Sequence, residues 1–69
     1  MTFAERLAER RAAAGISQAR VARLVDVTVQ TVGSWERGVT TPSIAHLRPL
    51  AAALDCEVTD LLPEHAEVA

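Results

Sequence analysis

Residues 18–38, which read QARVARLVDVTVQTVGSWERG, hold two short helical patterns with almost no loop between them. Each pattern is shorter than the roughly 12 residues that an isolated helix needs to be stable in water. The two helices can therefore form only if they pack against each other and against the rest of the chain. This feature constrains the fold more strongly than any other, because it requires two short helices to meet at a fixed angle.

The chain has 69 residues, of which 49% are apolar. This length allows one small domain, which buries about 60% of its unfolded surface and has little room for a catalytic cavity. No apolar run approaches the roughly 18 residues of a membrane span, so we expect no membrane contact. The lone Cys56 cannot form an internal disulfide, which fits a reducing cytoplasm.

Capping residues divide the whole chain into helical patterns, and no segment alternates as a strand does. Thr2 and Glu5 have the spacing of a capping box. The other expected helix starts are Ser17, Thr28 and Ser43, and the expected ends are Gly15, Asp26, Gly38 and Asp55. We therefore predict an all-α fold of five short helices, the last within residues 58–62.

Apolar residues at helical spacing give each expected helix a buried face. Those expected to be buried are Leu7, Val21, Ala22, Leu24, Val25, Val32, Trp35, Leu47, Leu50, Ala51 and Leu54. Pro49 falls inside the fourth pattern, where it removes a backbone donor. Either that helix has a short first turn and then a kink, which we favour, or it begins near Arg48.

The net charge of −2 hides an uneven distribution. All seven Arg lie within residues 1–54, against four acidic residues, whereas residues 55–69 hold five acidic residues and no basic one. Most of the chain is therefore mildly basic and could approach a polyanion on one face. We expect residues 1–62 to form the domain and residues 63–69 to be a flexible acidic tail.

Two short helices joined by a tight turn are typical of the DNA-binding helix-turn-helix. Its first helix crosses the phosphate backbone and its second lies in the major groove. A steep crossing requires a small residue at the contact, and Ala22 occupies that position. Asp26 stands where the backbone must turn left-handed. The side chains expected to lock the pair are Val21, Val25, Val27, Val32 and Trp35.

The segment SQARVARLVDVTVQTVGSWERGVTTPS resembles the phage-repressor family of helix-turn-helix proteins, the Cro and repressor, or XRE, type. The likeness extends over about residues 3–62 and includes SQ at 17–18, VT at 27–28, TVGSWERG at 31–38, PS at 42–43 and the closing LDCEVTDLL. It implies a compact lambda-repressor-like domain of five helices with the helix-turn-helix at helices two and three. It also implies sequence-specific binding of double-stranded DNA, often as a dimer.

The resemblance also implies roles for individual residues. Base-reading positions would be Thr28, Val29, Gln30, Gly33 and Ser34, and helical spacing places the last four on one face. Phosphate contacts would be Gln18, Arg23, Thr31, Arg37, Thr40 and Thr41. Arg20 and Arg23 could instead be solvated without a DNA contact.

Arg11 and Glu36 occupy positions that form a partly buried ion pair in some relatives, and we predict the same pair here. Val58, Leu61 and Leu62 are candidate dimer contacts. Leu61 and Leu62 could be core, dimer contact or one of each, and we expect one of each.

These features predict a bacterial or phage transcription regulator, a repressor that binds a palindromic operator as a homodimer in the cytoplasm, at the nucleoid. We expect no metal or cofactor, because His46 and His65 have no ligand partners at metal spacing. We expect no enzyme activity, because nothing in the sequence supplies an oxyanion hole or a nucleophile turn. The alternative is a protein-interaction module on the same fold, in which the acidic tail and VTDLL dock a protein partner. The sequence leaves open whether the regulator represses or activates, and whether it is an antitoxin or a restriction–modification controller.

Overall fold

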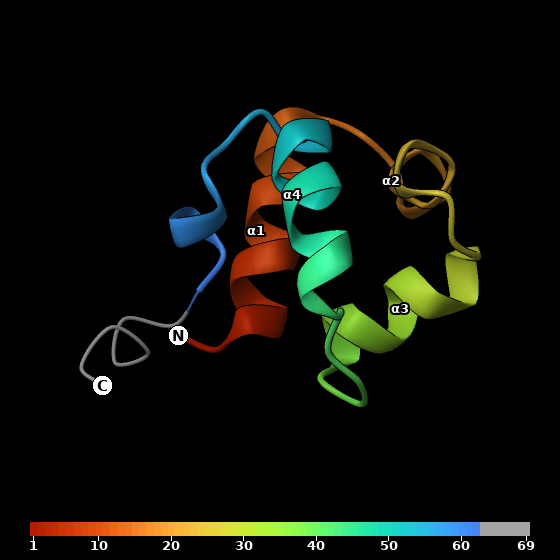
Figure 1. Cartoon of the computed structure of the whole chain (residues 1–69), viewed down its shortest axis with the longest axis horizontal. Coiled ribbons are helices and arrows are strands. Elements are labelled where there is room, and N and C mark those ends of the chain that lie inside the picture. Colours follow the sequence, from red (N-terminus) through yellow and green to blue (C-terminus); the bar gives the residue numbers. More distant parts are fainter. Residues whose placement is uncertain (63–69) are drawn as a thin grey trace.

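The computed structural model describes residues 1–62, and all of its regular structure is helical. The elements are α1 (Phe3–Ala14), α2 (Gln18–Val25), α3 (Val29–Arg37), α4 (Ile44–Ala53) and the short 3₁₀ helix η1 (Val58–Asp60), as Figure 1 shows. The all-α prediction agrees with this arrangement. The predicted flexible tail at residues 63–69 lies outside the described residues.

Each of the first three helices begins where a side chain caps its free N–H groups. The Thr2 hydroxyl accepts a hydrogen bond from the Glu5 N–H at 3.2 Å, and the Thr2 N–H donates to the Glu5 carboxylate at 2.9 Å, which completes the predicted capping box. Ser17 accepts from the N–H of Arg20, and Thr28 accepts from that of Thr31. Short helices with such caps can begin at one defined residue.

The same helices end where the backbone turns left-handed. Gly15 and Gly38 have φ values of 73° and 76°, and Asp26 has a φ of 65°. Asp55, after α4, has a φ of 55°. Aspartate tolerates this region better than most residues but less well than glycine, so the two Asp turns cost about 1 kcal/mol each.

Helix α4 contains Pro49 and runs as one helix on both sides of it. The alternative in which the helix begins near Arg48 is therefore wrong. Ser43 is the N-cap residue, but its hydroxyl makes no cap hydrogen bond and instead pairs with Nδ1 of His46 at 3.0 Å.

The predicted fifth α-helix is wrong. Residues 58–60 form only the 3₁₀ helix η1, in which the N–H of Leu61 donates to the carbonyl of Val58 at 3.0 Å. The Asp60 carboxylate accepts from the N–H of Glu57 at 2.9 Å, so the segment closes after one turn. Three residues are too few for a second α-helical turn. The described chain therefore has four α-helices rather than five.

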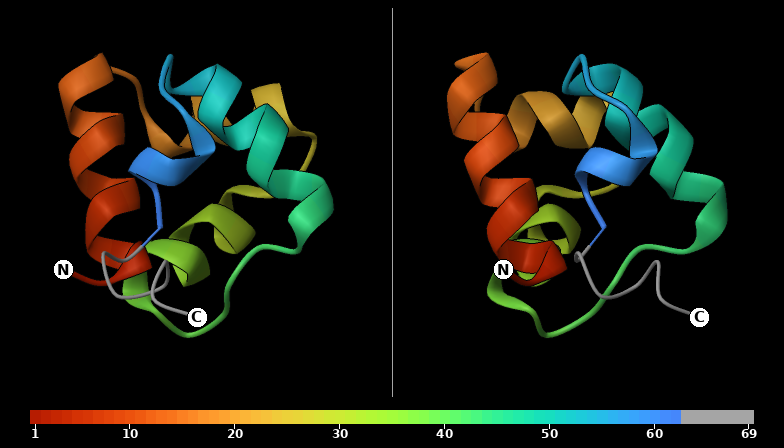
Figure 2. Two further views of the ribbon diagram at one scale, coloured as in Figure 1. Left: turned by 60° about the vertical axis from the view of Figure 1, so that its left-hand side comes forward. Right: turned by 90° about the vertical axis from the view of Figure 1, so that its left-hand side faces the viewer.

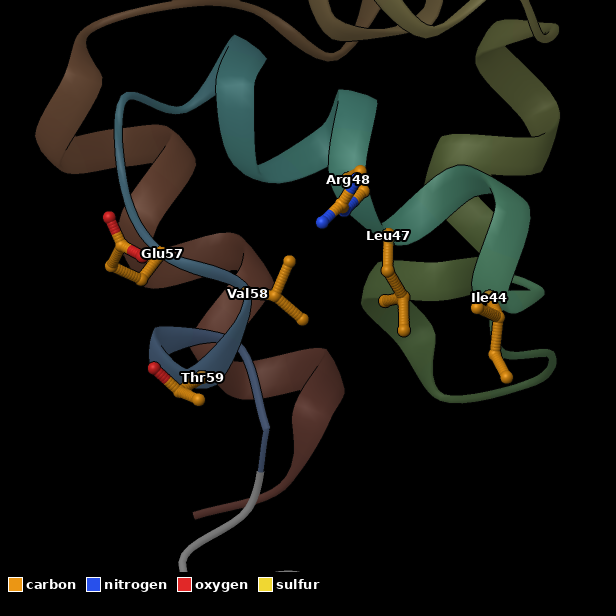
Figure 3. A pocket seen from close by; sticks show the side chains of 6 residues that line it. All are labelled: Ile44, Leu47, Arg48, Glu57, Val58 and Thr59. Carbon is orange, nitrogen blue, oxygen red and sulfur yellow. The ribbon is translucent and has the colours of Figure 1, made fainter.

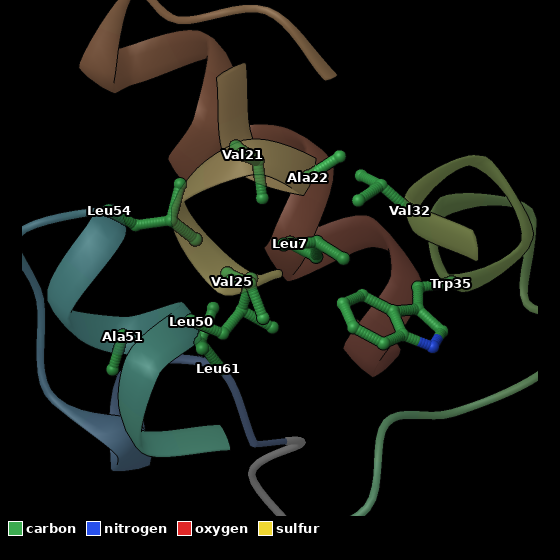
Figure 4. Packing of buried hydrophobic residues seen from close by; sticks show 10 residues of the cluster. All are labelled: Leu7, Val21, Ala22, Val25, Val32, Trp35, Leu50, Ala51, Leu54 and Leu61. Atoms are coloured by element: carbon green, nitrogen blue, oxygen red, sulfur yellow. The ribbon is translucent and has the colours of Figure 1, made fainter. Parts of the chain in front are cut away.

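One apolar core joins all of these elements. It contains Leu7, Val21, Ala22, Val25, Val32, Trp35, Leu50, Ala51, Leu54 and Leu61, which Figure 4 shows converging from four helices and η1. Leu24, predicted to be buried, is 48% exposed because it faces away from this cluster. Leu47 is only half-buried.

Helices α2 and α3 pack against each other and also against the rest of the domain, α2 on α4 and α3 on α1 (Figure 1). In that view α2 is seen nearly end-on while α3 lies across the picture, so the two cross steeply. Figure 2 shows η1 between α1 and α4. An ion pair of 3.5 Å between Arg10 and Asp60 links α1 to η1.

Leu61 is fully buried in the core of its own chain, which rules out the dimer contact predicted for it. Leu62 and Val58 keep part of their surface exposed. Of the two residues expected to divide between core and dimer contact, Leu61 is a core residue, and the dimer contact of Leu62 stays a prediction.

We expect Leu61→Ala to lower the free energy of unfolding by about 3 kcal/mol, because it removes a fully buried side chain and leaves a cavity. Leu62→Ala, next to it and partly exposed, should cost about 1 kcal/mol or less. Urea denaturation followed by circular dichroism measures both. Equal losses of unfolding free energy in the two variants would mean that packing at η1 does not hold the end of the domain against the core.

Candidate nucleic-acid interface

The steep pair of α2 and α3 is held by a turn of three residues and a small contact residue. Ala22 is 5% exposed where the two helices touch. Its carbonyl accepts a hydrogen bond from the N–H of Val27 at 2.9 Å, which closes the left-handed turn at Asp26. The inward residues of α3, Val32 and Trp35, are fully or almost fully buried. The outer face of α3 is therefore fixed relative to α2.

That outer face carries most of the residues predicted to read bases. Thr28, Val29 and Gln30 are exposed, and Ser34 is partly exposed. Val29 leaves 43% of its surface in water, so its apolar side chain is accessible on this face. The group combines an amide, two hydroxyls and a branched apolar side chain, which are the types that contact base edges in a major groove.

Gly33, the fifth predicted base-reading position, is buried. The guanidinium of Arg37 and the amide of Gln18 lie over it, 3.0 and 3.9 Å from where a Cβ would stand. Gly33 therefore presents no surface of its own in this structure.

The residues predicted to touch phosphates surround this face. Arg23, Arg37, Thr40 and Thr41 are exposed, whereas Gln18 and Thr31 are partly covered. The Thr31 hydroxyl pairs with that of Thr28 at 2.9 Å. Arg20 is also exposed, so both arginines of α2 are free to face solvent or a polyanion.

The predicted pair of Arg11 and Glu36 is present and is part of a larger network. Arg11 donates from Nε to Oε2 of Glu36 at 2.6 Å and from Nη2 to Oε1 at 3.1 Å. Its Nη1 donates to the carbonyl of Ile16 at 2.9 Å. The side-chain amide of Gln18 donates to Oε1 of Glu36 at 3.1 Å. One carboxylate thus joins α1, α2 and α3.

This environment changes both pKa values. Burial alone would raise the pKa of Glu36, but the hydrogen bonds from Arg11 and Gln18, with the charge of Arg11, outweigh burial and lower it. The hydrogen bond to Glu36 raises the pKa of Arg11. The pair is therefore fully charged at neutral pH.

A second surface feature lies away from this face, between α4 and η1. Figure 3 shows a groove of about 450 Å³ with Ile44, Leu47 and Arg48 on one side and Glu57, Val58 and Thr59 on the other. Ile44, at one edge of the groove, is 85% exposed. We name it the α4–η1 groove.

Two kinds of site do not occur among residues 1–62. No three or more His, Cys, Asp or Glu side chains gather as they would around a metal ion. No helix in this range is long and apolar enough to cross a bilayer.

Sequence reasoning missed three features of this surface. It did not anticipate that Gln18 bonds to Glu36, that Arg37 covers Gly33, or that Ile44 lines a groove. The pairing of Gln18 leaves no signal in sequence, since Gln18 and Glu36 are far apart in the chain. Ile44 could have been noticed, because it directly follows a capping Ser at a position that no buried face requires.

We expect Arg11→Ala to lower the free energy of unfolding by about 3 kcal/mol at neutral pH, because the Glu36 side chain, only 8% exposed, would lose its charge partner. The pH dependence has a definite sign. The folded-state pKa of Glu36 lies below the ordinary value of about 4.5, so the unfolded state binds more protons in this window. The stabilisation that ionised Glu36 provides is complete above pH 4.5 and is lost as the pH falls through the folded-state pKa of Glu36.

Urea denaturation between about pH 7 and pH 3 measures this loss. Glu36→Gln should be less stable at neutral pH and lose less of its stability on acidification than the original chain. Glu9→Gln is the matched control, because Glu9 is exposed on α1. If Glu36→Gln loses stability on acidification as steeply as the original chain, the Glu36 carboxylate is not the source of the pH dependence.

The comparisons with known proteins agree with this geometry. Residues 7–61 match the family model HTH_3, described as helix-turn-helix. The structure is similar to that of the P22 c2 repressor protein in complex with synthetic operator 9T, with a TM-score of 0.85 and 34% identity over 90% of this chain and 94% of that one. No curated protein matches the chain.

Two further solved structures are similar. The restriction–modification controller protein C.AhdI from Aeromonas hydrophila has a TM-score of 0.82 and 40% identity, over 87% of this chain and 91% of that one. The solution structure of the DNA-binding domain of the P22 c2 repressor has a TM-score of 0.87 and 32% identity, over 94% and 86%. The chain therefore belongs to the helix-turn-helix family of phage repressors and controller proteins.

Proposed function

We propose that this chain is a sequence-specific transcription regulator that binds double-stranded DNA through α2 and α3. The observation that carries the proposal is the outer face of α3, where exposed base-contacting side chains stand on a helix fixed steeply against α2. A structure with the same fold holds an operator, the P22 c2 repressor complex. In this proposal α2 and α3 are the helix-turn-helix, and α3 enters the major groove.

In this proposal, different side chains at the start and on the outer face of α3 contact different bases. The amide of Gln30 can donate to and accept from adenine, and Val29 can pack on a thymine methyl group. Thr28 and Ser34 can bond either kind of base edge. These contacts lie on one face, because positions 30 and 34 are one helical turn apart.

The surrounding polar residues position the domain on the backbone. Thr40 and Thr41 after α3 and Arg23 on α2 are exposed, which supports a role for them as phosphate contacts. Gln18 opens α2, where free backbone N–H groups favour a phosphate. A regulator of this kind acts in the cytoplasm, at the nucleoid.

We also propose that two copies assemble through the α4–η1 groove to read a palindromic site. The groove has an arginine, Arg48, on one side next to apolar Leu47 and Ile44, and a glutamate, Glu57, on the other side next to apolar Val58 (Figure 3). In a dimer with twofold symmetry each Arg48 can face the partner's Glu57, so the surface complements itself. Val58 keeps its predicted place as a dimer contact.

A charge exchange tests this interface. Arg48→Glu and Glu57→Arg should each raise the dimer Kd by about tenfold, because each change places like charges across the contact. The double variant should restore association, since it only reverses each pair. Arg20→Glu, on α2, is the matched control and should leave the Kd unchanged. Sedimentation equilibrium measures all four, and a double variant as weak as the single ones would contradict the pairing.

Selection from a random library of duplexes tests the DNA reading. We expect the protein to enrich one palindromic sequence. Gln30→Ala and Val29→Ala should each weaken binding to that duplex by roughly tenfold and leave binding to a scrambled duplex nearly unchanged. Ala12→Ser, an exposed change on α1 outside both proposed surfaces, is the control.

Fluorescence anisotropy over a salt series measures these affinities. A library in which nothing is enriched would exclude sequence-specific binding. It would favour the interaction module, in which the acidic C-terminal segment docks a protein. The burial of Leu61 already removes one apolar residue from that docking surface.

A further inference from the structure

Gly33 occupies the centre of α3, on the face proposed to meet DNA, and yet it is buried. Its cover comes from a side chain of its own helix. A Cβ at this position would stand 3.0 Å from Nη1 of Arg37 and 3.9 Å from both Cζ of Arg37 and Oε1 of Gln18. The space of the missing side chain is therefore occupied by a guanidinium.

Arg37 reaches this place by folding back along the helix. Helical side chains lean toward the N-terminus, so residue 37 lies over residue 33, one turn earlier. Nη2 of Arg37 also donates to the Ser34 hydroxyl at 3.4 Å. Within residues 1–62 this long bond is the only side-chain hydrogen bond of Arg37, so most of the five guanidinium donors remain available.

A side chain at position 33 would remove this seat. A contact of 3.0 Å is tighter than nine in ten contacts of real Cβ atoms, so the guanidinium would have to shift by a few tenths of an ångström. The fold would tolerate that movement, because the displaced group is the end of a flexible, exposed side chain. Alanine is also a better helix former than glycine. The stability of the fold therefore does not explain why residue 33 is glycine. The position of the Arg37 guanidinium does explain it.

We propose that Gly33 is a positioning residue that seats the guanidinium of Arg37 on the reading face of α3, where Arg37 reads a guanine. This inference rests on the proposed DNA binding and changes two roles within it. Gly33 supplies space rather than a base contact, and Arg37 becomes a base-reading residue rather than a phosphate contact.

Guanine fits the position and the donor geometry. The guanidinium lies against the middle of α3, beside Ser34, and not beyond the end of the helix. Arginine can donate two parallel hydrogen bonds to O6 and N7 of guanine in the major groove. With Gln30 on adenine, the helix then holds two side chains able to make bidentate base contacts.

The test compares the original chain with Gly33→Ala, Arg37→Ala, Arg37→Lys and the Gly33→Ala/Arg37→Ala double variant. Each is titrated onto the duplex that the original chain selects, onto that duplex with single guanine pairs replaced, and onto a scrambled duplex. Thermal unfolding of each protein is followed in parallel. Lysine keeps the charge of arginine but lacks its planar pair of donors.

We expect both Arg37 variants to lose roughly 5- to 100-fold in affinity for the selected duplex, and to become indifferent to one guanine pair. Gly33→Ala should lose affinity in the same way while its Tm stays unchanged or rises by a few degrees. The double variant should bind no more weakly than Arg37→Ala, because the seat has no effect once the arginine is absent.

Three results would overturn the inference. Gly33→Ala that binds like the original chain would show that the seat is not needed. Additive losses in the double variant would show that Gly33 acts independently of Arg37. Equal losses on selected and scrambled duplexes, with a salt slope reduced by about one, would make Arg37 a phosphate contact. If the original chain prefers no duplex, the proposed function as a sequence-specific regulator is wrong, and the roles assigned to Gly33 and Arg37 are wrong with it.

Discussion

Three helices of this domain meet at the carboxylate of Glu36. Arg11 reaches it from α1 with two hydrogen bonds, and Gln18 reaches it from the start of α2. Because Glu36 belongs to α3, this contact sets the angle of α3 against both other helices. The carboxylate is almost buried, so removing Arg11 would leave a nearly buried charge without its partner. The outer face of α3 can present a fixed pattern of side chains because this inner anchor does not move.

The apolar core and the charged anchor have separate tasks. Trp35 and Val32 fasten the inner face of α3 through packing, which has no preferred direction. The bonds at Glu36 are directional and fix the rotation of the helix about its own axis. A nine-residue helix needs both, since rotation by one residue would put Val29 or Thr31 in the place of Gln30. The seat of Arg37 on Gly33 depends on the same rotation.

Much of the fold could be predicted from local signals. Thr2, Ser17 and Thr28 cap helices where their spacing predicted, and the glycines and aspartates end them at left-handed positions. Predictions from local sequence signals were wrong where the pattern covered only a few residues. The apolar residues after Asp55 suggested a helix, but only one 3₁₀ turn forms. Leu24 fitted the inner face of α2 by spacing, yet it lies exposed, because the width of a buried face depends on what packs against it.

The sequence by itself determined the all-helical class, the starts and ends of the first three helices, the central place of Trp35 and the family likeness. These depend on hydrogen bonds and spacing within a few residues. Only the tertiary structure decided that Leu61 closes the core, that Gln18 bonds to Glu36 and that Arg37 covers Gly33. Leu61 and Gln18 depend on residues distant in the chain. The rotamer of Arg37 depends on space beside Gln18 of α2, which no pattern within α3 contains.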